Sequence, residues 1–259
     1  MGYLIERAAS DLRRAKYAIA LTGAGMSTES GIPDFRGPKG IWTLDPEAER
    51  RAYEIYHKFL KDPVAYSEER LSGPSILGDL SKVEPNPGHY ALAELEEMGV
   101  IKCIITQNVD NLHQRAGSSN VIDYHGNAFR LRCPCCVRRF QLEDFDLERL
   151  RRERRLPPTC PFCASPLKTD VVHFREPIPE DIARRAVEEV ERCDLMLVCG
   201  TSAVVYPFAA LPRMARQRRE VKIIEINMEP TPLTVERVSD YLIRGKTGEI
   251  LPEIVKKVR

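Results

Sequence analysis

Residues 17–27 read YAIALTGAGMS, a short apolar run that leads directly into a glycine-rich turn. The run Tyr17–Leu21 is typical of a buried strand, and the glycines of the turn let backbone N–H groups approach a phosphate. The turn does not match the G-x-G-x-x-G dinucleotide fingerprint, because Thr28 stands where the third glycine would be. By itself it predicts either a phosphate-binding loop or a tight turn without a ligand.

Further apolar runs later in the chain have the length of buried strands. They are Val100–Ile105, Val121–Tyr124, Leu195–Cys199, Lys222–Ile226 and Tyr241–Ile243. Helical patterns lie between them, at Ile5–Ala15, Ala91–Glu97, Glu180–Arg192, Phe208–Arg219 and Glu249–Val258. Strands that alternate with helices predict an α/β fold with a doubly wound parallel sheet.

Polar or glycine-rich loops follow four of these runs, at Gly23–Ser27, Gln107–Asp110, Gly200–Ser202 and Asn227–Glu229. Ligands of doubly wound sheets bind beyond the carboxyl ends of the strands. We therefore expect the four loops to meet at one edge of the sheet.

Two segments do not fit the alternation of strands and helices. Residues 38–87 are rich in aromatic, charged and proline residues, with helical patterns near Glu47–Leu60 and Pro63–Leu71, and residues 130–170 carry cysteine pairs. We expect both to be insertions that form a smaller domain. The predicted main domain then comprises residues 1–37, 88–129 and 171–259.

The 259 residues include 39 Lys and Arg against 38 Asp and Glu, a net charge of +1. This balance provides no global field for nucleic acid or an anionic membrane, so any nucleic-acid contact would be indirect. No apolar run approaches the roughly 20 residues that span a bilayer, and residues 1–7 lack the apolar core of a signal peptide. We expect a soluble cytoplasmic protein with no membrane partner.

Four of the eight cysteines form two C-x-x-C pairs, Cys133 with Cys136 and Cys160 with Cys163. Each pair supplies two thiolates on one knuckle of a tetrahedral site, which predicts one structural Zn²⁺. A redox dithiol is the alternative, and Cys135 is a competing neighbour. The other three cysteines lie on or beside apolar runs and are expected in the core.

Three further motifs carry candidate functional side chains. The charged and aromatic segment Gly31–Arg36 predicts a ligand contact, with an ordinary turn and ion pair as the alternative. Asn108 and Asp110, in the segment Thr106–His113, have the groups to hold an amide and ribose hydroxyls or to cap a helix. His125 is a structural histidine by default and becomes a catalytic candidate only if the strand-end loops surround it.

In this order, the motifs resemble the sirtuin family of NAD-dependent protein-lysine deacylases. The resemblance extends from about Ala18 to Pro252. The motifs that carry it are Gly23–Ser27, Gly31–Arg36, Thr106–His113, His125-Gly126, the four paired cysteines, Val171–Phe174, Gly200–Ser202 and Asn227. It implies a large Rossmann-like domain, a small domain made of a helical module (38–87) and a zinc-binding module (130–170), and a cleft between the two domains.

The resemblance also implies which residues contact NAD. Around the phosphates and adjoining riboses it places Ala24, Gly25, Ser27 and Ser202, and Gly23, Thr28, Gly200 and Thr201 complete these cofactor-binding loops. Near the adenosine it places Asn227, Glu229 and Thr247. Around the nicotinamide ribose and amide it places Asp34, Phe35, Arg36, Gln107, Asn108 and Asp110.

The implied reaction transfers the acyl group of an acylated lysine, in a protein or peptide, to ADP-ribose and yields nicotinamide, O-acyl-ADP-ribose and free lysine. His125 would be the general base, with Asn108 and Asp110 as further catalytic residues. Val171, Val172 and Phe174 would bind the substrate, and Phe35 and Phe174 would line an apolar lysine channel.

Three departures from the family pattern qualify these expectations. Arg175 stands where the family usually has glycine, which would narrow the peptide groove or favour acidic peptides. Tyr66 is followed three residues later by Glu69 and not by the arginine of succinyl-preferring sirtuins, so acetyl or longer apolar acyl groups are expected. The segment Ser72–Glu84 is longer than in compact relatives.

Two alternative functions remain open from the sequence. A mono-ADP-ribosyltransferase would use the same NAD pocket and pass ADP-ribose to a protein side chain, and Arg175 keeps this alternative open. A non-catalytic zinc module would bind a partner or nucleic acid through the arginine-rich run Arg149–Arg155, although a solvated helix face explains that run more simply.

Overall fold

The computed structural model describes residues 1–38, 40–71, 77–218 and 220–259. Its centre is a six-stranded sheet in the order β3-β2-β1-β7-β8-β9, in which all neighbouring strands are parallel. The strands are β1 (Ala18–Thr22), β2 (Ile101–Thr106), β3 (Val121–Asp123), β7 (Leu195–Cys199), β8 (Lys222–Asn227) and β9 (Tyr241–Arg244). All six predicted apolar runs are therefore strands, and the strand order reverses direction beside β1, as in other doubly wound sheets.

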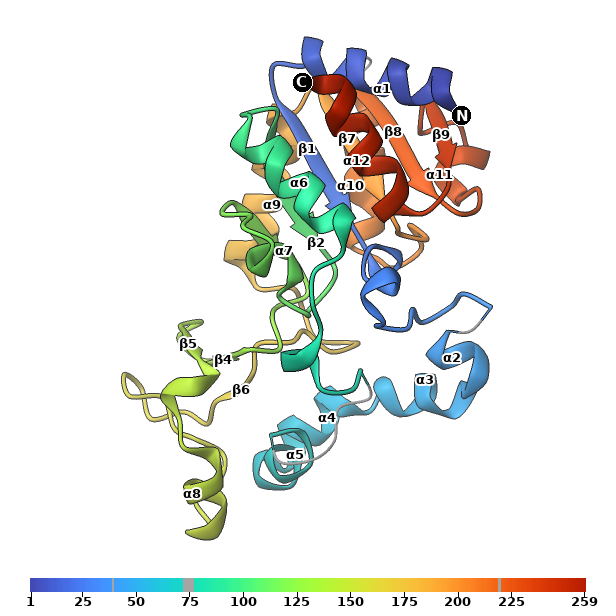
Figure 1. Cartoon of the computed structure of the whole chain (residues 1–259). Coiled ribbons are helices and arrows are strands. Elements are labelled where there is room, and N and C mark those ends of the chain that lie inside the picture. Colours follow the sequence, from blue (N-terminus) through green and yellow to red (C-terminus); the bar gives the residue numbers. More distant parts are fainter. Residues whose placement is uncertain (39, 72–76, 219) are drawn as a thin grey trace.

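Different helices cover the two faces of this sheet (Figure 1). Alternation along β1 sends Ala18 and Ala20 into one hydrophobic cluster and Ile19 and Leu21 into the other. The first cluster contains residues of α1 (Gly2–Arg14), α6 (Pro87–Glu97) and α12 (Thr247–Val258). The second contains residues of α9 (Glu180–Arg192), α10 (Leu211–Gln217) and α11 (Pro232–Val235). Both faces are covered, so every residue of β1 is buried.

The predicted helices of the main domain are present, and one of them is divided. The pattern Phe208–Arg219 becomes a short 3₁₀ turn, η5 (Phe208–Ala210), followed by α10, which ends at Gln217; residue 219 lies outside the described residues. Remaining short elements of this part are η1 (Ala24–Met26), η2 (Thr28–Ser30) and α7 (Leu112–Arg115). Among the described residues, no helix combines the length and apolar character needed to cross a bilayer.

Among its described residues, the helical module contains four short α-helices. They are α2 (Ile41–Leu44), α3 (Pro46–Ala52), α4 (Ile55–Lys61) and α5 (Pro63–Arg70), with η3 (Leu80–Lys82) further on. The predicted helical pattern near Glu47–Leu60 is interrupted, because the N–H groups of Tyr53 and Glu54 donate to the residues three positions earlier, Arg50 and Arg51. Part of the long segment Ser72–Glu84 lies outside the described residues.

The zinc-binding module is built on a small antiparallel sheet in the order β5-β4-β6. Its elements are β4 (Arg130–Arg132), β5 (Arg139–Gln141), η4 (Leu142–Asp144), α8 (Leu147–Arg152) and β6 (Lys168–Thr169). Figure 1 shows both modules on the same side of the large sheet, beyond the carboxyl end of β1. The chain therefore brings two small modules to the edge where the strand-end loops gather.

Candidate active site

The loops that follow β1, β2, β7 and β8 meet at one edge of the sheet, as the alternation of strands and helices predicted. The N–H of Gly25 donates to the carbonyl oxygen of Gly200 at 2.8 Å. Gln107 Nε2 donates to Thr201 Oγ1 at 2.7 Å, and Asn227 Nδ2 donates to the carbonyl oxygen of Thr201 at 2.8 Å. Hydrogen bonds thus join the four loops into one surface.

Close backbone packing explains the glycines at this edge. A Cβ atom on Gly25 would lie 2.9 Å from Gly200 Cα, and one on Gly200 would lie 2.4 Å from Met26 N. Gly200 also has a left-handed φ of +60°, which favours glycine. The N–H groups of Gly23, Gly25, Met26 and Ser27 all donate to protein carbonyls, so hydrogen bonds within the turn and to the end of β7 hold it in place.

Three predicted polar residues form one network between the β1 and β2 loops. Ser27 Oγ donates to Asp110 Oδ2 at 2.6 Å and lies 3.0 Å from Asn108 Nδ2, which also donates to the carbonyl oxygen of Gly23. Asp110 is only 4% exposed, and burial raises the pKa of its carboxyl group while the Ser27 hydrogen bond acts in the opposite direction. The network orients these side chains at the end of β2.

His125 follows β3 and lies beside the β2 loop. Its ring centroid is 5.6 Å from that of Tyr124 and 6.2 Å from that of Phe208. Burial lowers the pKa of the imidazole from 6.5 to about 4, and a hydrogen bond with the backbone of Gln107 acts in the opposite direction. The ring is therefore uncharged at neutral pH and has a nitrogen lone pair that can accept a proton.

His125 is also joined to the predicted substrate segment, residues 171–174. The N–H of Val172 donates to the carbonyl oxygen of His125 at 2.8 Å. Gly126 has a left-handed φ of +79°, and a Cβ atom there would lie 2.0 Å from the carbonyl oxygen of Asp170. The His125-Gly126 motif therefore needs its glycine, because the chain that leads into the substrate segment passes directly against it.

Four aromatic rings pack together where the helical module meets residues 171–174. The ring centroids of Phe35 and Trp42 are 4.8 Å apart, those of Trp42 and Phe174 are 5.4 Å apart, and those of Phe174 and Tyr53 are 4.6 Å apart. The sequence analysis predicted Phe35 and Phe174 but missed Trp42 and Tyr53. Their only signal was the aromatic content of the helical insertion.

The segment Gly31–Arg36 forms the turn and the ion pair that the sequence analysis gave as the alternative to a ligand contact. Asp34 Oδ1 accepts a hydrogen bond from the N–H of Gly37 at 3.0 Å, as in an ordinary turn. Arg36 pairs with Glu49 of α3 at 3.3 Å, so the ion pair of the simpler interpretation is present. The same segment carries Phe35 into the aromatic cluster beside the substrate segment.

Three further predicted NAD contacts are Glu229, Thr28 and Thr247. Glu229 is exposed and pairs with Arg244 at 2.6 Å. Thr28 Oγ1 donates to the carbonyl oxygen of Gly25 at 3.0 Å. Thr247, at the start of α12, is buried, and its hydroxyl has no partner among the described residues. These side chains are not joined to the hydrogen-bond network around Asp110 in the described part of the chain.

A buried ionic cluster supports the substrate segment from the zinc module. Lys168 Nζ donates to the carbonyl oxygens of Thr169 at 2.7 Å and Val171 at 2.8 Å, and lies 3.2 Å from Glu176 Oε2. Arg132 pairs with the other carboxylate oxygen of Glu176, and all three charged side chains are at most 6% exposed. The sequence analysis missed this cluster, because no local pattern distinguishes its members from exposed charged residues.

Tyr66 of α5 connects the helical module to Thr169 and to the substrate segment. Its hydroxyl lies 2.8 Å from Thr169 Oγ1 and 2.8 Å from His173 Nε2. The side chain is fully buried, so it faces the protein interior and not an open acyl pocket.

Burial lowers the pKa of four of the five histidines in the sequence. They are His89, His113, His125 and His173. His89 and His113 lie ring to ring at 4.9 Å, and His113 Nε2 is 2.9 Å from Thr22 Oγ1 at the end of β1. These four imidazole rings are therefore uncharged at neutral pH.

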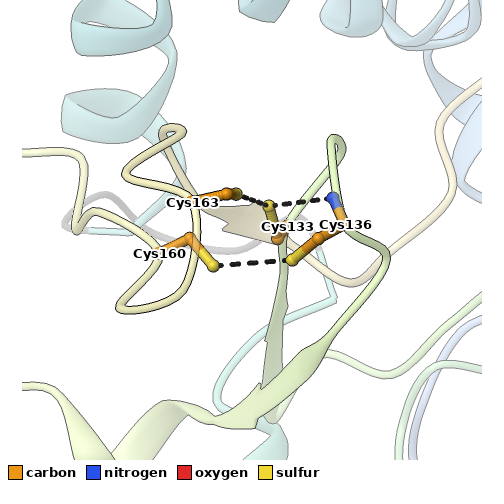
Figure 2. Close-up of side chains that lie close together, drawn as sticks. All are labelled: Cys133, Cys136, Cys160 and Cys163. Atoms are coloured by element: carbon orange, nitrogen blue, oxygen red, sulfur yellow. Dashed lines mark hydrogen bonds between the residues drawn. The ribbon is translucent and has the colours of Figure 1, made fainter.

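The four predicted metal ligands converge in the zinc module (Figure 2). The sulfur atoms of Cys133, Cys136, Cys160 and Cys163 all lie within 4.8 Å of one another. The distance is 3.4 Å from Cys133 to Cys163 and 3.6 Å from Cys136 to Cys160. Tetrahedral Zn–S bonds of ~2.3 Å would hold sulfurs ~3.8 Å apart, so the donor set fits one zinc ion. Cys135 is exposed and lies outside the cluster.

Comparison with known proteins gives the same family as the motifs. The sequence model of the Sir2 family matches residues 23–207, most of the chain. The chain belongs to the Sir2 family. A Sir2 relative from Thermococcus kodakarensis, an NAD-dependent protein deacylase, is 45% identical over 258 residues, which are 99% of this chain and 96% of the relative.

Solved Sir2 structures support the fold over nearly the whole chain. A Sir2 homologue in complex with NAD superposes with a TM-score of 0.77 at 43% identity and covers 98% of this chain and 93% of its own. A Sir2 protein with a p53 peptide and NAD⁺ gives 0.73 at 33% identity, with 95% of each chain covered. The predicted sirtuin membership and the α/β fold with a Rossmann-like sheet are confirmed. The predicted NAD and zinc agree with the Sir2 complexes and with the cysteine cluster.

Proposed function

We infer that this Sir2 protein is an NAD-dependent protein-lysine deacylase. The observation that carries the inference is the position of His125, which joins the strand-end loops to the substrate segment through its backbone hydrogen bond with Val172. A single imidazole thus lies between the edge that would hold a dinucleotide and the chain that would hold a peptide. The deacylase names of the relatives support the same activity.

We place the dinucleotide along the joined strand-end loops. Ala24, at the start of η1, is not among the donors that hold the glycine turn, and Ser202 is exposed, so both can face the phosphates. We place Asn227, Glu229 and Thr247 on the adenosine side; the Thr247 hydroxyl has no hydrogen-bond partner among the described residues. The remaining proposed contacts are Gly23, Gly25, Ser27, Thr28, Asp34, Phe35, Arg36, Gln107, Asn108, Asp110, Gly200 and Thr201.

The bound dinucleotide supplies a glycosidic carbon that becomes electrophilic as nicotinamide leaves. The protein's part is to position the acyl oxygen of the substrate against that carbon and to exclude competing nucleophiles. The Ser27–Asn108–Asp110 network orients polar groups toward the nicotinamide end. His125, uncharged at neutral pH, takes a proton from a ribose hydroxyl so that this oxygen can attack the acyl carbon. With one water consumed, the products are nicotinamide, O-acyl-ADP-ribose and free lysine.

The peptide substrate is an acylated lysine with its flanking residues. Val171 and Val172 would pair with the substrate backbone as a strand, and the ring cluster of Phe35, Trp42 and Phe174 would line the channel for the lysine stem. Because Tyr66 is buried against Thr169 and His173, its hydroxyl is not available to hold an acidic acyl group. We therefore propose acetyl and longer apolar acyl groups as substrates.

The domain division follows the same arrangement. We propose a Rossmann-like domain of residues 1–37, 88–129 and 171–259, with residues 38–87 and 130–170 as the helical and zinc-binding modules of the smaller domain. A zinc ion held by the four cysteines would fix the antiparallel sheet that leads into the substrate segment. The eight cysteines, none of them in a disulfide, favour a cytoplasmic location.

The alternative functions have weaker support. The arginine-rich run lies on and after the exposed helix α8, where Arg149 and Arg155 both pair with Glu153. Such internal pairing is typical of a solvated helix face and not of a nucleic-acid surface. No contact in the described residues specifically favours transfer of ADP-ribose to a protein side chain.

The test is a product assay with an acetyl-lysine peptide and NAD labelled in the adenosine part. We expect nicotinamide and O-acetyl-ADP-ribose in equal amounts, both dependent on the acetylated peptide, and loss of both in His125→Ala. Nicotinamide release that does not depend on acylated peptide, or label that stays on denatured protein, would reject the deacylase assignment and favour the transferase.

A further inference from the structure

Arg175 directly follows the substrate segment and has a strained backbone. Its φ is 66°, in the left-handed region that glycine adopts freely and that other residues occupy at a cost. The sirtuin resemblance predicts glycine at this position, so this chain keeps the glycine conformation and adds a guanidinium group. The side chain is exposed. Position 175 therefore combines a left-handed backbone with an exposed guanidinium group directly after the substrate segment.

The guanidinium lies at a hollow of about 400 Å³ between the helical module and the end of the substrate segment. The residues that line this hollow are Tyr53, Glu54, Tyr56, His57, Leu60 and Arg175. The Arg175 guanidinium carbon lies 5.6 Å from the centre of the Tyr53 ring, and Tyr53 also packs on Phe174 of the substrate segment. Tyr53 therefore connects the hollow to the aromatic cluster that would line the lysine channel.

The guanidinium group of Arg175 has no ion-pair partner in the described part of the chain. None of the ion pairs within 4.0 Å formed by the described residues includes this guanidinium. Glu54 is the carboxylate that lines the hollow, and His57 is the other titratable cation-forming group there besides Arg175. A guanidinium group beside the Tyr53 ring presents donors that match a carboxylate.

We propose that Arg175 and this hollow form a subsite for an acidic residue of the substrate, close in sequence to the acylated lysine. The proposal rests on the proposed deacylase function, because the position of the peptide follows from the substrate segment. Arg175 is then a specificity residue that attracts aspartate or glutamate side chains, and Glu54 limits the preference by repelling the same carboxylates.

The experiment compares acetyl-lysine peptides that differ at one position. Glu, Gln or Lys is placed at each of the two residues on either side of the acetyl-lysine, and kcat/KM is measured for the full-length protein at low and high salt. We expect the best Glu peptide to exceed its Gln counterpart roughly two- to fivefold at low salt, as for an exposed ion pair, with a smaller ratio at high salt.

Two variants test whether Arg175 and Glu54 determine the preference for glutamate over glutamine in the peptide. Arg175→Gly suits the left-handed backbone and should reduce the Glu-to-Gln ratio to about one, whereas Glu54→Gln should increase it. Arg154→Gly is the matched control, because Arg154 is also an exposed arginine with a left-handed φ, here 54°, but follows α8 in the zinc module. It should leave the ratio unchanged.

The outcomes separate this inference from the proposed function. If no acetylated peptide is turned over, the deacylase function itself is wrong. If Glu, Gln and Lys peptides are turned over equally, or if Arg175→Gly keeps the Glu preference, the acidic subsite is wrong while the deacylase function stands. If succinyl-lysine replaces acetyl-lysine as the preferred substrate and Arg175→Gly abolishes this, the hollow binds an acyl carboxylate and the peptide subsite is likewise rejected.

Discussion

Replacing Lys168 with methionine tests whether the buried ionic cluster positions the substrate segment. The change keeps the unbranched apolar part of the side chain but removes the ammonium group. The carbonyl oxygens of Thr169 and Val171 lose this donor, and Glu176 loses one ion-pair partner. Removing one member of a buried ion pair destabilises a protein by about 3–5 kcal/mol. Glu176 still accepts from the His173 N–H at 3.0 Å.

The loss should lie near the lower end of that range. Burial lowers the pKa of Lys168 to about 8, so enclosing its ammonium already costs free energy that the methionine does not incur. We expect a loss of about 3 kcal/mol, or a fall in Tm of roughly 6–12 °C for a chain of this size. Because Val171 lies in the substrate segment, the KM for the acetylated peptide should also rise. The KM for NAD should not, since Lys168 makes none of the contacts that join the strand-end loops.

Thermal unfolding and steady-state kinetics of the same preparation measure both effects. Lys102→Met is the matched control: Lys102 Nζ makes a hydrogen bond to the Gly99 carbonyl on the surface, and its loss should cost less than about 0.5 kcal/mol. Equal stability of Lys168→Met and the unaltered protein, or an equal rise in the KM values for NAD and peptide, would refute the positioning role.

The other predictions concern the metal, the histidines and the strained arginine. Cys160→Ala should release one zinc ion per chain and lower Tm, which metal analysis and thermal unfolding would show; full zinc retention would contradict the structural site. The four buried histidines have folded-state pKa values below 6.5, so on acidification the unfolded state binds protons first. The contribution of these histidines to stability is therefore fully present above pH 6.5 and decreases toward pH 4. The decrease is at most about 1.4 kcal/mol per pH unit for each histidine. Urea unfolding at pH 7.5, 6.5 and 5.5 would measure this decrease. Arg175→Gly should not reduce stability and should raise it by up to about 1 kcal/mol, because glycine relieves the left-handed backbone; a lower unfolding midpoint would contradict the strain.

Local patterns predicted the meeting of the strand-end loops well, because each loop is a short stretch of continuous sequence. The run that ends in Gly23 and the run that ends in Gly200 each specify a buried strand followed by a tight turn. Parallel strands bring their carboxyl ends to the same side, so the loops had to meet. The Gly25–Gly200 contact, at which a Cβ atom would lie 2.9 Å from backbone, shows why both turns need glycine.

The interruption between α3 and α4 was not visible in the sequence. Ala, Arg, Glu and Tyr around Tyr53 are all compatible with a helix, and the change to hydrogen bonds three residues back comes at the point where Tyr53 packs on Phe174. Tertiary packing overrides weak helix propensity at such a position.

The sequence by itself determined the sheet, the loops at its edge and the four cysteines of the cluster, since apolar runs, glycine turns and C-x-x-C spacing are local features. Only the tertiary structure decided that Lys168 and Glu176 are buried together, that Tyr66 faces the interior, and that Arg175 meets Tyr53 at a hollow. Whether a charged side chain is exposed or enclosed depends on segments distant in the chain, and burial changes its free energy far more than its neighbours in sequence do.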